Sequence, residues 1–554
     1  MSLVVESIDY HPFSKSIKAM SLSIKTNDST IDNSRSFPLQ SLTFDSVVIQ
    51  EFSLWKAIRH NIIKAGVVLT ARPELIFRKS ENTTDTVASV ESQIKFLSNY
   101  NPNTIIPMEF NIIRLKYGTI EYNSDSSDIS LGSADFSIEL RDFSTIENSL
   151  NKNTDSFVFS KRIIIDVSNL SRKLKNGRVL RVKKIEFDSH AENLKVAKAS
   201  LSGIATGVLD SLMINNVTLS GISIKELGNI ELISFNSILI DTSYLSLFPQ
   251  RRNSLNSLSY SKIADEIANY IKTFKVDTIH VKNIFADGFN ESDNELIFGI
   301  SGLNFSLNDL MIDSTSIAND LLPDYNKLLF EIDSVRLLDN INVDANNINY
   351  SSSLARLSFT DFKHHVDSFS NNFFCKQVVV DDIILKNFFN NSADSNVRIK
   401  LIELVLNYSI NEKASKPYKL NDNEFFSNLL FRKIDIVNAN VELTKTNEFR
   451  IISQNVNVNL DFNKNIALNS TEKTKYIKEL LWNTGYTEFF DLNKDISINL
   501  SSSHYNNHDI SFSNGSFKMK QNTGPLELLS INWKKFTFND FDFAGLVNEE
   551  IVNV

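Results

Sequence analysis

Cysteine, glycine and proline are all scarce in this chain of 554 residues. The single cysteine, Cys375, excludes an internal disulfide framework, so stability has to come from packing and backbone pairing. The 15 glycines and 9 prolines make up about 4% of the chain, against roughly 12% on average. So few turn-forming residues disfavour a sandwich built on tight turns.

An excess of basic charge is missing as well. The chain has 57 Lys and Arg residues against 66 Asp and Glu residues, for a net charge of -9. Because nucleic acids are bound by basic surfaces that displace counterions, we expect no nucleic-acid partner. The sequence also has no run of 18 or more apolar residues, which a membrane-spanning helix would need. The segment from Met1 to Tyr10 lacks a secretory signal, so we expect either a cytoplasmic protein or a chain that begins downstream of a removed targeting segment.

Alternating apolar residues predict β-strands instead. Hydrophobic residues make up 42% of the chain, and 40 Phe and 14 Tyr favour strands. From Leu209 to Ile240, apolar residues recur with a spacing of two within short groups, whereas Asn215, Thr218 and Lys225 between them are polar. This spacing predicts strands with one apolar face in a one-sided antiparallel sheet. The apolar positions are Leu212, Ile214, Leu219, Ile222, Ile224, Ile230, Leu232, Ile238 and Ile240.

A short unit recurs along the chain. It reads apolar, polar, any, apolar, any, apolar, and then Asn, Asp or Tyr two positions later. Five copies end at Tyr117, Asn216, Asn283, Asn387 and Asn438. Their uneven intervals are unlike the fixed period of a solenoid or a propeller. We therefore predict an irregular array of strands.

Four segments have helical spacing instead. They run from Ser53 to Lys64, Asp85 to Tyr100, Ser259 to Phe274 and Ser470 to Asn483, and each begins with a plausible N-cap residue. Their apolar stripes favour helices that cap or cover strands over helices that lie on a membrane surface. A Ser- and Asn-rich stretch from Arg251 to Ser261 predicts a hinge between two halves, residues 1–250 and 251–554.

The sequence contains no local catalytic or metal-binding motif. Phosphate-binding glycine loops, nucleophile elbows and His-Glu-x-x-His are all missing from it. Cys375 lies among apolar residues, which is typical of a small core residue. His364 with His365, and His504 with His508, lack a third ligand at metal-binding spacing and are interpreted as surface residues. We expect no enzyme, no metal and no cofactor.

Several strand pairs carry a resemblance to a known family. They are "SIDYHPFSKSIKAMSLSIK" (Ser7 to Lys25), "LTFDSVVIQEFSLWKAI" (Leu42 to Ile58), "LTARPELIFRK" (Leu69 to Lys79), "FNIIRLKYGTIEY" (Phe110 to Tyr122), "LLPDYNKLLFEIDSVRL" (Leu321 to Leu337) and "VVVDDIILKNF" (Val378 to Phe388). In this order they resemble the periplasmic AsmA-like proteins of Gram-negative bacteria. The resemblance implies an AsmA-like β region over residues 1–250 and a continuous β-repeat region over 251–554.

The resemblance implies an elongated, curved antiparallel β-sheet that forms an apolar groove, similar to the bridge-like lipid transfer proteins, with a few short amphipathic helices. It implies a periplasmic protein that binds or conducts phospholipid acyl chains for outer-membrane lipid homeostasis, with other envelope proteins as possible partners. An inner-membrane anchor of about 20 apolar residues would then be encoded upstream of Val4. The nine apolar positions of the alternating stretch are the candidate groove residues.

Three alternatives stay open at the level of sequence. The same apolar residues fit the core of a closed sandwich, in which a second sheet covers them. A β-rich adhesin or scaffold that binds protein or glycan is a rival function. An enzyme that acts on envelope glycans through scattered carboxylates is a third, since catalytic carboxylates need not be close in sequence.

Overall fold

The computed structural model of the chain describes the segments in which the strands lie. These are residues 2–25, 39–79, 107–124, 130–146, 160–173, 178–202, 209–222, 232–248, 273–290, 292–313, 325–338, 342–365, 372–384, 397–410, 430–445, 448–467, 477–491, 493–506, 509–520 and 527–539. The predicted hinge from Arg251 to Ser261 and the predicted helix from Asp85 to Tyr100 lie outside these residues.

The chain divides into two compact units, which are described separately. The first unit holds β1 (Ser2–Val4), β2 (Ser7–His11), β3 (Ser16–Lys25), β4 (Leu39–Gln50), α1 (Leu54–His60), β5 (Ile63–Ala71), β6 (Glu74–Lys79), β7 (Met108–Ser124), β8 (Ser130–Ser144), β9 (Arg162–Lys173), β10 (Val179–Asp188), β11 (Asn193–Ser202), β12 (Leu209–Ser220) and β13 (Leu232–Leu247). The second holds β16 (Lys327–Leu337), β17 (Asn342–Ser351), β18 (Arg356–His365), β19 (Asn372–Asp381), β20 (Val397–Ile410), β21 (Leu430–Lys445), β22 (Phe449–Ala467), β23 (Ile477–Thr484), β24 (Thr487–Asp491), β25 (Ile496–Leu500), β26 (Ser502–Asn506), β27 (Asp509–Lys520) and β28 (Glu527–Phe538). Strands β14 (Thr273–Phe289) and β15 (Leu296–Asp313) contribute residues to both units.

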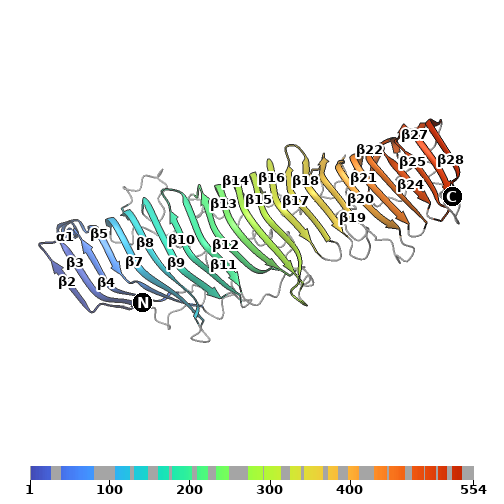
Figure 1. Cartoon of the computed structure of the whole chain (residues 1–554). Coiled ribbons are helices and arrows are strands. Elements are labelled where there is room, and N and C mark those ends of the chain that lie inside the picture. The colour runs from blue at the N-terminus through green and yellow to red at the C-terminus, as the bar shows by residue number, and fades with distance from the viewer. Residues whose placement is uncertain are drawn as a thin grey trace. The chain divides into compact units, whose positions relative to one another are not determined.

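Strands that follow one another in the chain are mostly neighbours in the sheet. From β7 to β13 each strand pairs antiparallel with the next, and the same holds from β16 to β20 (Figure 1). Parallel pairs join β5 and β6 to β7, and β20 to β21. The predicted fold class, mainly β with a largely antiparallel sheet, is confirmed.

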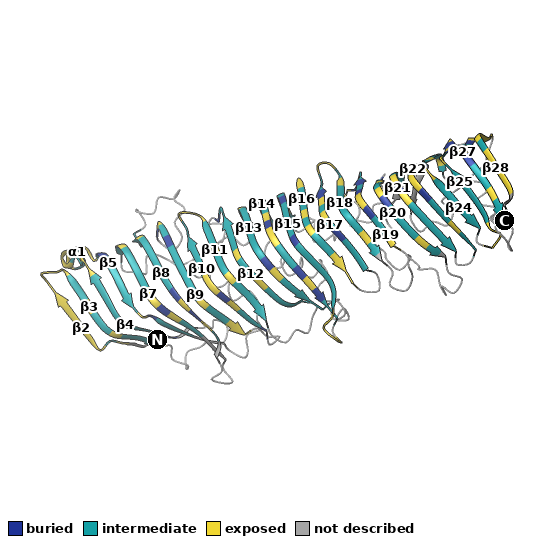
Figure 2. Ribbon diagram, in the orientation of Figure 1, coloured by how far each residue is buried: buried dark blue, intermediate teal, exposed yellow. Residues whose placement is uncertain are grey.

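Each unit is a single layer in its described residues. The elements that pack extensively on one another are hydrogen-bonded neighbours in the sheet, apart from α1 on β5. A strand covered on one face by a second sheet alternates between buried and exposed residues. In β12 no residue is buried and most are half-buried, as along many strands in Figure 2. The described strands therefore do not form the closed sandwich that the sequence left open.

Residues with left-handed backbone conformation interrupt many strands. Five residues end the copies of the short sequence pattern described above. Three of them, Tyr117, Asn283 and Asn438, have φ values of 57°, 54° and 55°. Asn216 is not among the left-handed residues, but Thr242 on the neighbouring strand β13 has φ 46°, and Asn387 lies outside the described residues. Left-handed residues other than glycine are uncommon and occur at β-bulges and turns. Three of the five copies of the recurring unit thus end at a bend inside a strand.

These residues reverse the alternation of side chains while keeping the apolar face continuous. In β20, Leu401 precedes Glu403 by two positions, and Leu404 follows it directly. In β21, Ile436 precedes Asn438 by two positions and Ala439 follows it directly. Ile436 pairs with Leu401 of β20, and Ala439 pairs with a residue of β22. Glu403 and Asn438 lie at the same level of this parallel pair, since Ile402 pairs with Val437 just before them. The bends of β20 and β21 are therefore aligned.

Asn438 offers a direct test of this backbone conformation. A left-handed conformation costs a residue with a branched Cβ about 1 to 2 kcal/mol, whereas glycine adopts it freely. We expect Asn438→Val to lower the free energy of unfolding by about that amount and Asn438→Gly to leave it nearly unchanged. Urea unfolding measures both. The same valine at exposed Lys400 of β20, where the backbone is not left-handed, is the control and is expected to have little effect.

One predicted helix is confirmed over part of its length, because α1 ends at His60 and Ile63 and Lys64 belong to β5, and another predicted helix is wrong. The segment from Ser53 forms α1, and Ser53 is its N-cap, with its Oγ accepting a hydrogen bond from the Lys56 amide. The helix predicted from Ser470 to Asn483 is instead strand β23 where the structure describes it, from Ile477 onwards. There, pairing with β22 and β26 satisfies the backbone and buries Leu480, which local helical spacing does not foresee. Only Thr273 and Phe274 of the predicted helix from Ser259 are described, and both belong to β14.

Candidate functional site

The candidate groove residues of β12 and β13 lie on one face of the first unit. Directly opposed residues of paired strands share a face. Leu219 pairs with Ile238, and on the next strand it pairs with Leu194. The same face continues through three further rows across β11, β12 and β13, namely Val196, Val217 and Ile240; Ala199, Ile214 and Ser243; and Leu201, Leu212 and Leu245.

The alternation on this face reverses between Ile214 and Val217 and, on β13, between Ile240 and Ser243. Thr242, with φ 46°, lies at this reversal, opposite Asn215. Sequence reasoning grouped Leu212, Ile214 and Leu219 correctly on one face, but it did not include Val217 or Leu245. Both would have been found if the alternation had been allowed to shift by one residue at a polar position, so that apolar residues three positions apart share a face.

The other candidates have different positions. Ile222 follows β12, is buried, and donates its backbone amide to the carbonyl oxygen of Glu192. Leu232 is the first residue of β13, and its side chain is not described. Ile224 and Ile230 lie outside the described residues. Five of the nine candidates are thus brought together on β12 and β13.

The second unit carries a denser apolar surface that sequence reasoning did not single out. Cys375 has no exposed surface and lies between Phe362 of β18 and Leu404 of β20 in the register. The rings of Phe362 and Phe373 meet edge to face with centroids 5.6 Å apart. Burial in this layer comes from large neighbours on the same face. The buried members of this cluster are Tyr350, Cys375, Val378, Val380, Ile383, Val397, Leu404 and Ala439.

Cys375 fits the interpretation as a core residue. Its Sγ contacts the carbonyl oxygens of Gln377 and Ile402 at 3.2 and 3.4 Å. Burial raises the pKa of its thiol, which favours the neutral and unreactive form. Among the residues that the structure describes, no group of three or more His, Cys, Asp or Glu side chains is arranged to hold a metal ion.

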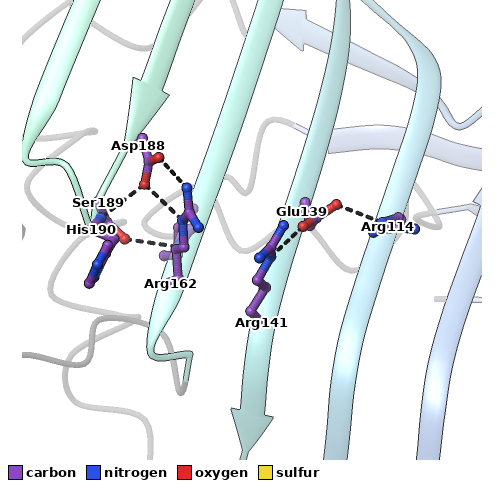
Figure 3. Close-up of polar contacts among 8 residues, drawn as sticks. Arg114, Glu139, Arg141, Arg162, Asp188, Ser189 and His190 are labelled. Atoms are coloured by element: carbon purple, nitrogen blue, oxygen red, sulfur yellow. Dashed lines mark hydrogen bonds and ion pairs between the residues drawn. The ribbon is translucent and has the colours of Figure 1, made fainter.

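The opposite face carries rows of ion pairs. In the first unit, Glu139 of β8 accepts hydrogen bonds from Arg114 of β7 at 2.6 Å and from Arg141 at 2.5 Å (Figure 3). On the neighbouring strands Arg162 binds both carboxylate oxygens of Asp188. Arg114 and Glu139 are directly opposed, one position away from the apolar pair Leu115 and Ile138. Charged and apolar side chains therefore occupy different faces of the same strands.

The second unit shows the same separation. Lys376 of β19 pairs with Glu403 of β20 at 2.8 Å, next to the buried Cys375 and Leu404. Arg336 and Asp344 join β16 to β17 in the same way. Exposed ion pairs of this kind add little stability, at most about 1 kcal/mol each. The charged side chains keep one face of the sheet hydrated, while the other face is apolar.

Glu139 is the most enclosed carboxylate of these ion pairs. Burial acts to raise its pKa, but hydrogen bonds from Arg141 and Arg114 outweigh burial, so the pKa of Glu139 lies below its ordinary value of 4.5. A carboxylate with a lowered pKa stabilises the fold above its unfolded pKa, and this stabilisation is lost as the pH falls through the folded value. The side chain also borders an open hollow of about 240 Å³, lined in part by Lys116, Tyr117 and Asp166.

We expect Glu139→Gln to lower the unfolding temperature at pH 7, because two arginines lose their counter-charge. The difference from the unchanged protein should shrink as the pH falls from 4.5 through the lower folded pKa of Glu139, at which Glu139 itself becomes protonated in the folded protein. Thermal unfolding across this pH range measures it. The same change at Glu442, which has one arginine partner and is more exposed, should have a smaller effect. A difference for Glu139→Gln that does not depend on pH would contradict this explanation.

No protein family matches the sequence, and no curated protein is similar to it. No helix in the described part of the chain is long and apolar enough to cross a membrane. A function therefore has to be inferred from the geometry of the two faces.

Proposed function

We propose that the protein is a non-enzymatic envelope protein that binds or conducts phospholipid acyl chains along its apolar face. The observation that carries this proposal is a largely apolar face, continuous across β11, β12 and β13, on which no described element other than the neighbouring strands packs extensively. Apolar surface of this extent is unfavourable in water and calls for an apolar partner. Acyl chains supply such a partner at any position along the strands.

The alignment of the strand bends supports this proposal. Left-handed residues such as Thr242, Glu403 and Asn438 bend strands and increase their twist, yet leave the apolar side chains on one face. A sheet with one apolar face and one ion-paired face has the chemistry of a lipid-binding surface. It is also what the resemblance to AsmA-like and bridge-like lipid transfer proteins implies.

The proposal places the protein in the periplasm of a Gram-negative cell, where it contributes to outer-membrane lipid homeostasis. An inner-membrane anchor and envelope protein partners belong to this proposal. The segregation of charge to one face suits a protein that is surrounded by water on the outside and carries lipid on the inside.

Native mass spectrometry of the chain purified from a Gram-negative host tests the proposal. We expect additional masses that correspond to phospholipids, and these should disappear after extraction with organic solvent. A lipid-free protein that instead enriches a protein or a glycan from the envelope would favour the rival function, an adhesin or scaffold. In that case the apolar face would be covered by protein.

A further inference from the structure

Helix α1 presents its apolar side chains to solvent. The sequence predicts that its apolar stripe packs onto strands, yet Ile58 is 76% exposed, Trp55 is 65% exposed and Leu54 is 45% exposed. None of the seven residues of α1 is buried (Figure 2). Within the described part of the chain, β5 is the one element on which α1 packs extensively. These exposed side chains are available to a partner outside the described part of the chain.

A second exposed aromatic residue lies beside the start of this helix. The hairpin between β2 and β3 has Phe13 at its tip, and this side chain is fully exposed. The hairpin is joined to the segment before α1, because the Phe52 amide donates to the Lys15 carbonyl oxygen at 2.8 Å. The hairpin tip and the helix therefore belong to the same end of the strands, as Figure 1 shows for β3 and α1.

Basic residues accompany these apolar ones. Arg59 lies over the ring of Trp55, with its guanidinium carbon 5.0 Å from the ring centroid. Lys56 and His60 belong to the same helix, whose first turn has no acidic residue and whose last turn is basic. A tryptophan, aliphatic residues and cations on one short exposed element are the composition of helices that lie in the headgroup region of a bilayer.

We propose that α1 and the tip of the β2–β3 hairpin form a docking site for the surface of an anionic phospholipid bilayer. Trp55, Ile58 and Phe13 enter the boundary between headgroups and acyl chains. Lys56 and Arg59 lie at the level of the phosphates, where each cation adds attraction to an anionic surface. This inference concerns a surface separate from the proposed acyl-chain face, and it would bring one end of the first unit to a membrane.

Vesicle co-sedimentation of the full chain tests the docking site. We expect binding to vesicles of phosphatidylcholine with about 30% phosphatidylglycerol, and weaker binding to phosphatidylcholine alone. The double variant Trp55→Ser/Ile58→Ser should bind about tenfold more weakly, since two apolar anchors are lost. The double variant Lys56→Glu/Arg59→Glu should lose the preference for anionic vesicles. All four side chains are on an exposed helix, so folding should be preserved.

A matched control is Leu354→Ser, because Leu354 is 67% exposed in the hairpin between β17 and β18 of the other unit. It should bind vesicles as the unchanged protein does. Quenching by brominated phospholipid should also fall when Trp55 is replaced by Phe, which reports insertion of this side chain. The proposal is overturned by a lack of vesicle binding, by unchanged binding of Trp55→Ser/Ile58→Ser, or by an equal loss in Leu354→Ser.

The docking proposal and the acyl-chain proposal can be tested independently of each other. If Trp55→Ser/Ile58→Ser loses vesicle binding and still copurifies with phospholipid, docking at α1 is supported independently of the apolar face. If the unchanged protein binds vesicles but never carries lipid, the proposed function fails and the docking site stands.

Discussion

Replacing Val397 by aspartate is expected to lower the free energy of unfolding by about 3 to 5 kcal/mol. Val397 has no exposed surface and begins β20 within the buried cluster of the second unit. Its neighbour in the register is Phe431 of β21, and Val380 and Ile383 belong to the same cluster. A carboxylate at this position would lose its hydration without gaining a cationic partner on the apolar face.

Urea unfolding of Val397→Asp and Lys400→Asp compares the two faces of the same strand. Lys400 is exposed, three positions along β20, and its replacement should change stability by no more than about 0.5 kcal/mol. Equal losses from both variants would mean that the two faces do not differ as described. A negligible loss from Val397→Asp would mean that the cluster contributes little to the stability of this single layer.

Replacing Ile240 by aspartate should have its main effect on lipid rather than on stability. Ile240 is half-buried on the apolar face, where it pairs with Val217. We expect about tenfold less copurified phospholipid, because a carboxylate against an acyl chain is strongly unfavourable. The loss of stability should be about 1 kcal/mol, because the side chain keeps access to water.

Phosphate analysis of solvent extracts, normalised to protein, measures this loss. The control is Thr218→Asp, on the other face of the neighbouring strand, where Thr218 pairs with Leu239. Thr218→Asp should retain lipid. If Ile240→Asp unfolded the protein and no lipid was ever found with the unchanged chain, the apolar face would be a protein core covered by another part of the molecule.

Local alternation was sufficient to predict a mainly β chain and the strands β12 and β13, since side chains on opposite faces of a strand meet different environments. The alternation does not report what covers the apolar face. Leu212 and Ile214 have the same pattern in a sandwich and in a single layer, and the difference depends on strands far apart in sequence. The sequence therefore left both possibilities open, and the pairing of the strands decided against a sandwich among the described residues.

The left-handed residues explain why the spacing of two was found only in short groups. A left-handed residue shifts the alternation of side chains by one position. Leu401 and Leu404 therefore share a face although they are three residues apart. Asn and Asp occur often at such positions because their side chains tolerate this conformation, which makes the polar end of the recurring unit physically meaningful. The segment from Ile477 shows how local spacing can also predict the wrong element. Its residues also fit helical spacing, and only the partners β22 and β26 make it a strand.

Site-specific photo-crosslinking tests the central claim most directly. A photoreactive residue at Ile214 or Ile240 would lie on the apolar face, and one at Thr218 would lie on the other face of β12. We expect phospholipid adducts at Ile214 and Ile240 in cells, detected by mass spectrometry of the purified protein, and none at Thr218. Adducts of equal yield from both faces, or protein adducts in place of lipid at Ile214 and Ile240, would contradict an apolar face that carries lipid.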